Sequence, residues 1–305
     1  MSLRQVLAVV DLSPAGIHAA WRAARVAWAQ GAALRLLALV ELPYRHPLFG
    51  PGSAAPFERA RAELSHLADE IAASIGLRPE VVVGTHEDEA AAWRAHARGA
   101  GLVVVPGEPA GLRLAGWLHG GLAERVLRQA GTPVFIARRP SGTVHRRVLA
   151  VVDADLETAG PVLRAAQWFC RPEALLACHV LDPAIQRHLA AADLPLPAIH
   201  AWMDTAVLRA RAALADQLGR AELPAARAVV LRGPALPQLV GEQQRSGASL
   251  VVVTKPRRAW WADLARPSLG RQLADRVACD VLWLPTPAPS ARAARQRLAL
   301  HAASE

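Results

Sequence analysis

The sequence is poor in cysteine, and its cysteines are not spaced for a metal site or a disulfide framework. Its 305 residues include three, Cys170, Cys178 and Cys279, which is an odd number without a CxxC pair. A structural zinc site and a set of disulfides are therefore not expected, and this cysteine usage favours a reducing compartment.

Long apolar runs are also lacking. Arg35 and Glu41 interrupt the most apolar segment, which does not approach the roughly 18 residues of a membrane span. The first apolar run, 6–10, stops at Asp11 and is too short for the core of a signal peptide. We therefore expect a soluble, cytoplasmic protein without membrane association.

Lysine is almost absent, because Lys255 is the only one in the chain. The formal net charge of +9 comes from arginines scattered along alanine-rich segments, not from a basic run interleaved with aromatic residues. This pattern does not indicate a nucleic-acid surface, and we expect no nucleic-acid partner.

Hydrophobic residues are abundant, at 52% of the chain against 20% charged. Such a composition favours packed cores over disorder. At about 150 residues per domain, the length suggests two domains.

An internal repeat supports that number. The matching segments are VLAVVD at 6–11 and 148–153, LVVV at 102–105 and 250–253, and the residue pair Val134 and Val281. The duplication predicts one domain at 1–142 and a second at 143–287, joined near Ser141 and Gly142 and followed by a tail at 288–305.

Within each copy, short runs rich in valine and leucine alternate with longer stretches of helical period. Strands are predicted at 5–10, 34–40, 80–84, 102–106 and 133–137, and again at 147–152, 174–181, 226–232, 249–254 and 280–284. Helices are predicted at 14–30, 55–75, 87–99 and 121–130, and again at 157–169, 198–219, 235–246 and 268–278. The fold class is therefore α/β, with two tandem copies of a five-stranded, parallel, doubly wound (Rossmann-like) domain.

Ligands of such sheets bind beyond the carboxyl ends of the strands, where the strand order reverses. Asp11 ends the first strand, where a carboxylate either contacts a ligand or caps the next helix, and both interpretations stay open. For Asp153, at the same place in the second copy, capping is favoured.

The loop after the fourth strand of the first copy is rich in glycine. It holds Gly107, Gly111, Gly116, Gly120 and Gly121 just before a predicted helix. Glycines let backbone N–H groups approach a phosphate at a helix N-terminus. The alternative is a flexible lid without a ligand.

The corresponding loop of the second copy has no glycine until Gly270 and carries adjacent tryptophans, Trp260 and Trp261. Its basic side chains could hold an anion, although a solvated basic loop is the simpler interpretation. The tryptophans either anchor a partner or an apolar ligand, or pack against their own domain.

Taken together, VLAVVD, the second strands LLALVE and LLACHVLD, the fourth strands LVVVPG and LVVVTK, and the segment GGLAERVLRQAGTPVFIARR resemble the universal stress protein family, in its tandem two-domain class. The resemblance implies a stress-response binding protein that is not an enzyme. It also implies pairing of the two last strands, which would make the chain an intramolecular pseudo-dimer with hidden strand edges.

ATP-binding members of that family carry the pattern G-x2-G-x9-G-[ST] in the fourth loop. In the first copy the pattern falls on Gly107, Ala110, Gly120 and Gly121, so the second glycine and the hydroxyl are replaced. In the second copy it falls on Thr254, Arg257, Pro267 and Ser268, where only the hydroxyl survives. The resemblance therefore implies one candidate ATP site, in domain 1, made of Asp11, Val40, Gly107, Gly120 and Gly121, with Asp11 near the base and Val40 lining its pocket.

We predict neither catalytic residues nor metal ligands. The leading hypothesis is a non-enzymatic tandem stress protein that binds an adenine nucleotide in domain 1. The alternative is a nucleotide-independent scaffold that binds a protein or an apolar ligand through Trp260 and Trp261. A weaker hypothesis is a slow ATPase that uses His119, beside the glycine-rich loop.

Overall fold

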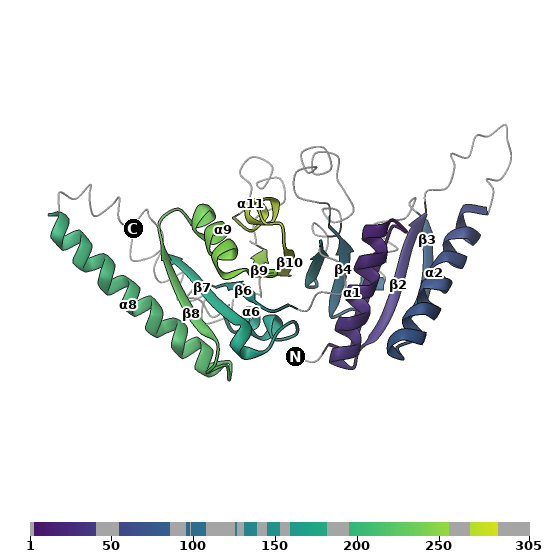
Figure 1. The fold of residues 1–305 in the computed structure, drawn as a ribbon, viewed down its shortest axis with the longest axis horizontal. Helices are drawn as coiled ribbons and strands as arrows, with labels where there is room; N and C mark the ends of the chain where they lie inside the picture. The colour runs from purple at the N-terminus through teal and green to yellow at the C-terminus, as the bar shows by residue number, and fades with distance from the viewer. Residues whose placement is uncertain are drawn as a thin grey trace, which may run out of the picture.

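The structure is a computed structural model, and it describes residues 3–40, 55–85, 96–97, 99–107, 126, 131–138, 145–152, 159–181, 195–255 and 269–285. Figure 1 shows these parts as one arched sheet with helices on both of its faces. The first half of the chain forms one side of the arch and the second half forms the other.

The first half contains, in chain order, β1 (Gln5–Val10), α1 (Pro14–Gln30), β2 (Ala33–Val40), α2 (Ala55–Ile75), β3 (Glu80–Thr85), β4 (Leu102–Pro106) and β5 (Val134–Ala137). The second half contains β6 (Val148–Val151), α6 (Ala159–Ala166), the short 3-10 helix η2 (Pro172–Ala174), β7 (Leu175–Leu181), α8 (Leu196–Arg220), β8 (Arg227–Arg232), α9 (Ala235–Ser246), β9 (Leu250–Lys255), α11 (Leu269–Arg276) and β10 (Asp280–Pro285).

These elements confirm the strands expected from the sequence, each within one residue at either end. Six expected helices are also confirmed, with α1, α2 and α9 matching at both ends. The helices predicted at 87–99 and 121–130 lie largely outside the described residues.

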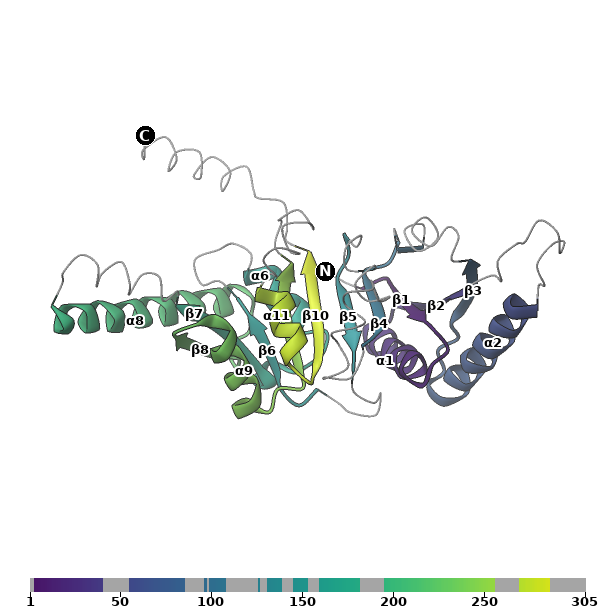
Figure 2. The same ribbon diagram turned by 90° about the horizontal axis from the view of Figure 1, so that it is seen from above.

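The strands form a single sheet in the order β3-β2-β1-β4-β5-β10-β9-β6-β7-β8. The strands of each half pair in parallel, whereas β5 and β10 pair antiparallel, so the halves meet at this one seam (Figure 2). Facing residues across the seam are Ile136 and Val281, Phe135 and Leu282, and Val134 and Trp283.

The inner strands of this sheet are buried on both faces, as the apolar runs predicted. In β1, Val6, Ala8 and Val10 belong to one core and Leu7 and Val9 to the other. The first core includes residues of α1, α2, α6 and α8, and the second includes residues of α9 and α11. Because successive side chains of a strand point to opposite faces, only runs without polar alternation can satisfy both cores.

Helix α1 has clear sequence signals at both ends. Ser13 is the N-cap, Pro14 is the first helical residue, and Gly31 ends the helix in the left-handed conformation with φ of 60°. Gly31 donates its N–H to the carbonyls of Ala27 and Trp28 in the last turn.

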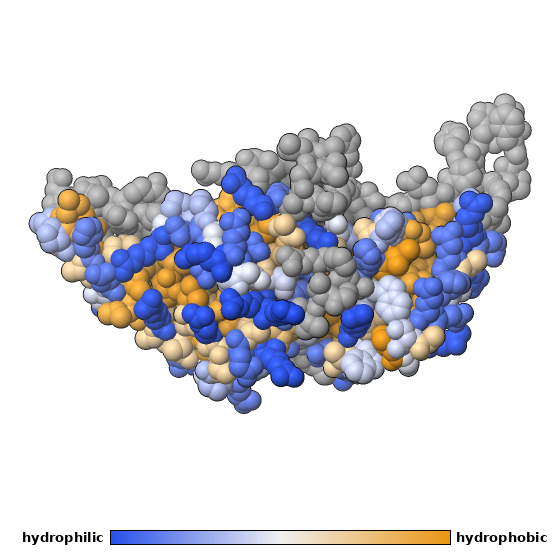
Figure 3. Space-filling view, viewed as in Figure 1, coloured by the Kyte–Doolittle hydropathy of each residue, from blue (hydrophilic) through white to orange (hydrophobic). Residues whose placement is uncertain are grey.

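The surface is mixed in polarity. Figure 3 shows polar side chains on the outward side of α2, and apolar surface around the outer strand β8, between α8 and α9. Among the described helices, none combines the length and apolar character required to cross a bilayer.

The thiol of Cys178 in β7 should be chemically inert in the folded protein. Its side chain is buried, and burial raises the pKa of the thiol to about 12, with the Glu242 carboxylate adding to the shift and Arg245 opposing it. We expect iodoacetamide at pH 8 to alkylate Cys178 only after unfolding, which peptide mass spectrometry can measure.

The same shift makes stability depend on pH. The folded pKa of Cys178 lies above the ordinary value of 9.0. The contribution of the protonated thiol to the free energy of unfolding is therefore complete below pH 9 and is lost as the pH rises toward 12. Cys178→Ser should flatten that decline in the free energy of unfolding. The predicted inertness of the Cys178 thiol would be contradicted if iodoacetamide alkylated the native protein as fast as the unfolded protein.

Candidate functional site

The strand order defines one place in the first half where a ligand would bind. Strand β1 lies between β2 and β4, so the chain leaves β1 to one side of the sheet and returns on the other. Ligands of open α/β sheets bind at such a switch point, beyond the carboxyl ends of the strands.

Three of the predicted site residues lie at that edge. Asp11 follows β1, Val40 is the last residue of β2, and Gly107 follows β4. Gly120 and Gly121 lie outside the described residues, as does Ala110. The sheet therefore brings together residues that are distant in sequence, and the glycine-rich part of the predicted site stays a prediction.

Asp11 supports the start of α1. Its Oδ1 accepts hydrogen bonds from the backbone N–H of Ser13 at 3.1 Å and from the Ser13 hydroxyl at 2.6 Å. The Ser13 hydroxyl oxygen in turn accepts from the N–H of Gly16 at 3.1 Å, which is an N-cap bond. Asp11 thus stabilises the helix start indirectly, by orienting the residue that caps it.

The bonds that support the helix start use only one oxygen of the Asp11 carboxylate. Asp11 is exposed, and among the described residues Oδ2 has no hydrogen-bond partner. The two interpretations drawn from the sequence are therefore compatible, because each can use a different oxygen.

The turn around Asp11 is tight. Leu12 adopts φ of 59°, a left-handed conformation that is uncommon for a residue with a side chain. A Cβ at Gly16 would collide with Oδ1 of Asp11, so the first turn of α1 can approach the carboxylate only because residue 16 is glycine.

Gly107 has a packing role that the motif did not reveal. Its N–H donates to the carbonyl of Ala137 at 2.8 Å, so it continues the pairing of β4 with β5. A Cβ there would lie 2.5 Å from Cγ of Arg138 and 2.6 Å from Cγ2 of Ile136. The N–H that the motif would offer to a phosphate is therefore engaged in the sheet.

Val40 is half-buried at the end of β2, where it faces Thr85 of β3. This position agrees with a side chain that covers part of a ligand at the edge of the sheet.

In the second half, the strand register shows which residue replaces Gly107. Pro106 faces Ala137 in the first half, and Thr254 faces Leu284 in the second, so Lys255 is the counterpart of Gly107. The motif alignment had placed Thr254 there, one residue away. Lysine thus replaces glycine at the position where a Cβ would collide with its neighbours in the first half.

Other candidates of the second half lie outside the described residues, including Asp153, Arg257, Trp260, Trp261, Pro267 and Ser268. His119 of the first half also lies outside them. Cys178 belongs to the core on the α9 side, and Nδ1 of His179 lies 3.3 Å from the carbonyl oxygen of Val152. Among the described residues, no group of three or more His, Cys, Asp or Glu side chains is arranged to hold a metal ion.

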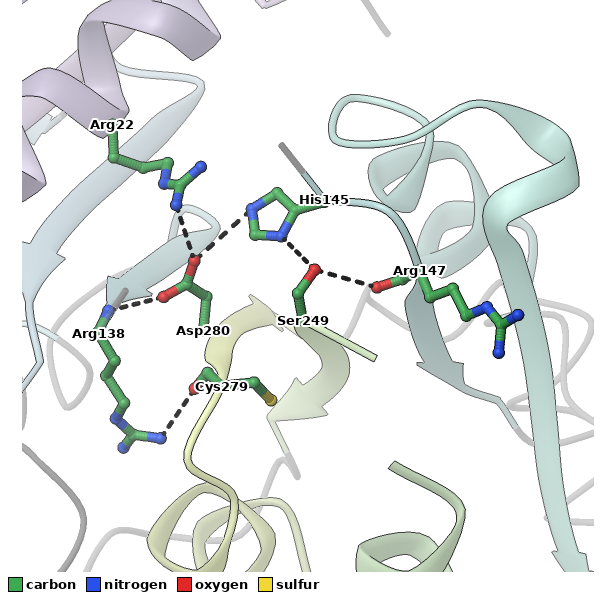
Figure 4. A network of polar contacts seen from close by, with 7 residues as sticks. All are labelled: Arg22, Arg138, His145, Arg147, Ser249, Cys279 and Asp280. Atoms are coloured by element: carbon green, nitrogen blue, oxygen red, sulfur yellow. Dashed lines mark hydrogen bonds and ion pairs between the residues drawn. The ribbon is translucent and has the colours of Figure 1, made fainter. Parts of the chain in front are cut away.

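Sequence reasoning missed a cluster of buried charge at the seam between the halves, formed around Asp280 (Figure 4). The repeat did contain one signal that could have indicated this cluster. When Val134 is matched with Val281, a carboxylate in the second copy replaces Pro133 of the first, at the start of an otherwise apolar strand.

The fold and this edge define the class: two doubly wound α/β units in tandem, each with a switch point between its first and fourth strands. The sequence model of the universal stress protein family matches residues 2–138 and 145–285. The chain therefore belongs to the universal stress protein family.

Solved structures agree on the fold. A universal stress protein from Archaeoglobus fulgidus DSM 4304 is 14% identical, with 94% of this chain and 97% of that chain covered, at a TM-score of 0.68. A protein described as functionally unknown, from Pseudomonas aeruginosa PAO1, is 17% identical, with 93% of each chain covered, at a TM-score of 0.63.

A third structure, described as a universal stress protein from Pseudomonas aeruginosa UCBPP-PA14, is 18% identical, with 93% of this chain and 94% of that chain covered, at a TM-score of 0.58. The comparison with curated proteins found no match.

Gly107→Ala should destabilise the protein whether or not a nucleotide binds. The added methyl group would press on Ile136 and Arg138, and overpacking of this kind costs about 1–3 kcal/mol. Gly131→Ala is the matched control, because its Cβ would meet no atom within 4 Å. Urea unfolding measures both, and equal stability of the two variants would contradict the packing role.

Ser13→Ala should lower the free energy of unfolding by about 1 kcal/mol, because it removes the N-cap acceptor for Gly16. Asp11→Ala should cost less, since it leaves the Ser13 hydroxyl in place. Thermal unfolding followed by circular dichroism measures both, and a larger loss in Asp11→Ala would show that Asp11 is the true cap.

Proposed function

We propose that this protein is a cytoplasmic, non-enzymatic stress-response protein that binds an adenine nucleotide, with ATP as the candidate ligand, at the switch point of domain 1. The observation that carries the proposal is the convergence of Asp11, Val40 and Gly107 at one edge of the sheet, with Oδ2 of Asp11 open to a ligand among the described residues.

Each of these residues has a chemical role in such a site. The carboxylate of Asp11 can accept a hydrogen bond from an exocyclic amine of a base or from a ribose hydroxyl. Val40 offers apolar surface to the face of the base. Since the Gly107 N–H is engaged, phosphate contacts would fall to the later glycines, Gly120 and Gly121, at the start of the predicted helix.

We propose that only domain 1 binds the nucleotide. Lys255 stands in the place of Gly107 in the second half, so a residue with a side chain replaces the glycine with which the motif of the first half begins. The expected stoichiometry is one nucleotide per chain.

We further propose that domains 1–142 and 143–287 act as an intramolecular pseudo-dimer. Support comes from the antiparallel pairing of β5 with β10, which joins two similar halves edge to edge. This pairing covers two strand edges that would otherwise be open to other chains.

Native mass spectrometry of the full chain with Mg-ATP tests the nucleotide site. Wild type should retain one ATP per chain, and Gly120→Trp should retain none. Asp11→Ala should lose binding, whereas Ser13→Ala is the matched control that weakens the same helix start but keeps the carboxylate.

Wild-type protein that binds no ATP at millimolar concentration would refute the nucleotide site and favour the scaffold hypothesis, with Trp260 and Trp261 as the next residues to replace. Equal loss in Asp11→Ala and Ser13→Ala would show that Asp11 acts only through the helix cap.

A further inference from the structure

The seam between the halves contains a buried carboxylate that both halves contact. Asp280 begins β10 and is fully buried. Its Oδ2 lies 3.4 Å from the guanidinium of Arg22 on α1 and 3.6 Å from Nε2 of His145. Its Oδ1 accepts the backbone N–H of Arg138, just after β5, at 2.7 Å (Figure 4).

Arg138 contacts the second half a second time. Its guanidinium Nη1 donates to the carbonyls of Ala274 at 2.9 Å and Val277 at 3.1 Å, and lies 3.4 Å from that of Cys279. These carbonyls lie at and just beyond the C-terminus of α11, where a cation is favourable. One residue of the first half therefore holds both Asp280 and the end of α11.

The register of the seam has a centre of pseudo-symmetry. Phe135 faces Leu282, and these two positions are each other's counterparts in the repeat. On this matching, Asp280 takes the place of Pro133, and Pro285 takes the place of Arg138. The carboxylate and its donor thus occur on one side of the centre and have no counterpart on the other.

This asymmetry penalises a pairing of two second halves. In a symmetric β10–β10 seam, Pro285 would occupy the position of Arg138 opposite the buried Asp280. Proline has no N–H to donate to the carboxylate and no guanidinium for the end of α11. The second half does have an arginine, Arg164, at the position equivalent to Arg22. Discrimination against a β10–β10 pairing therefore depends on Arg138 and not on Arg22.

A pairing of two first halves is penalised for the opposite reason. Arg22 is 4% exposed and points to Asp280, whereas a second first half would present Pro133 in its place. Loss of the Asp280 carboxylate would remove one ion-pair partner of a buried guanidinium, and such a loss is destabilising.

We propose that Asp280 and Arg138 make this seam a heterotypic interface: the β10 edge accepts the β5 edge of a first half and rejects a second β10 edge. The partner that fits is therefore domain 1 of the same chain. The interface is closed to symmetric association through like edges. This inference does not depend on nucleotide binding.

The experiment uses the full chain and hydrogen exchange of the seam amides, read by mass spectrometry. Arg138→Pro introduces the residue of the second half, and Asp280→Asn keeps the shape but removes the charge. Both should speed exchange in β5 and β10 by about tenfold or more while β2 and β7 keep their protection, because each variant weakens hydrogen bonds to a charged group. Arg22→Met removes a contact to Asp280 and should also speed exchange at the seam, whereas Arg164→Met, at the equivalent position of the second half, is its matched control and should leave the seam unchanged.

Mass measurement by light scattering then tests specificity. Arg138→Pro should remain a single chain, since its exposed β10 edge still presents Pro285. The double variant Arg138→Pro with Pro285→Arg restores the donor on the second half and should form a two-chain species, which Asp280→Asn should abolish. The proposal is overturned if Arg138→Pro alone dimerises as readily as the double variant, if the double variant stays a single chain, or if Asp280→Asn leaves seam exchange unchanged.

Discussion

The antiparallel pairing of β5 with β10 is the contact on which the architecture depends, because it turns two five-stranded sheets into one. A short strand pair alone is a weak joint, since few ladder hydrogen bonds cross it. Here it is reinforced by side chains: Phe135 at the centre of the seam stacks on Phe169 of the other half at a ring distance of 5.0 Å, and Arg22 and Arg138 contact Asp280 beside it. The joint therefore combines apolar burial with a charged contact that only one arrangement satisfies.

The candidate site shows how structural and binding demands share the same residues. Asp11 uses one oxygen to orient Ser13, and its other oxygen is not bonded within the described parts of the chain, so helix capping and ligand recognition need not compete. Gly107 is different, because its N–H is engaged by Ala137 and its missing Cβ makes room for Ile136 and Arg138. A glycine in a nucleotide motif can thus be required by the packing of the sheet. Arg138 also links this point to the seam, since the same side chain lies over Gly107 and reaches α11.

Much of the fold could be predicted because its signals are local. Apolar runs such as 102–105 have no polar alternation and therefore indicate strands buried on both faces, and Ser13, Pro14 and Gly31 mark the ends of α1. The predicted strand bounds also placed Asp11, Val40 and Gly107 at the carboxyl ends of strands, whereas their assignment to one nucleotide site came from the resemblance to the family. What could not be predicted were contacts between segments far apart in the chain. The hydrogen bond from Gly107 to Ala137 becomes visible only in the structure, whereas the match of Gly107 with Lys255 was already present in the repeat of LVVVPG and LVVVTK and the strand register confirms it.

The sequence by itself determined the duplication, the α/β class, the strand positions and the family, because a repeated segment and strand periodicity are properties of neighbouring residues. Only the tertiary structure decided what Asp280 does. In the sequence it is one carboxylate at the start of an apolar strand, 258 residues beyond Arg22 and 142 beyond Arg138 in chain position. A buried charge is tolerated only where its partners converge on it, and that convergence arises when two sheet edges pair and bring α1, β5 and β10 together.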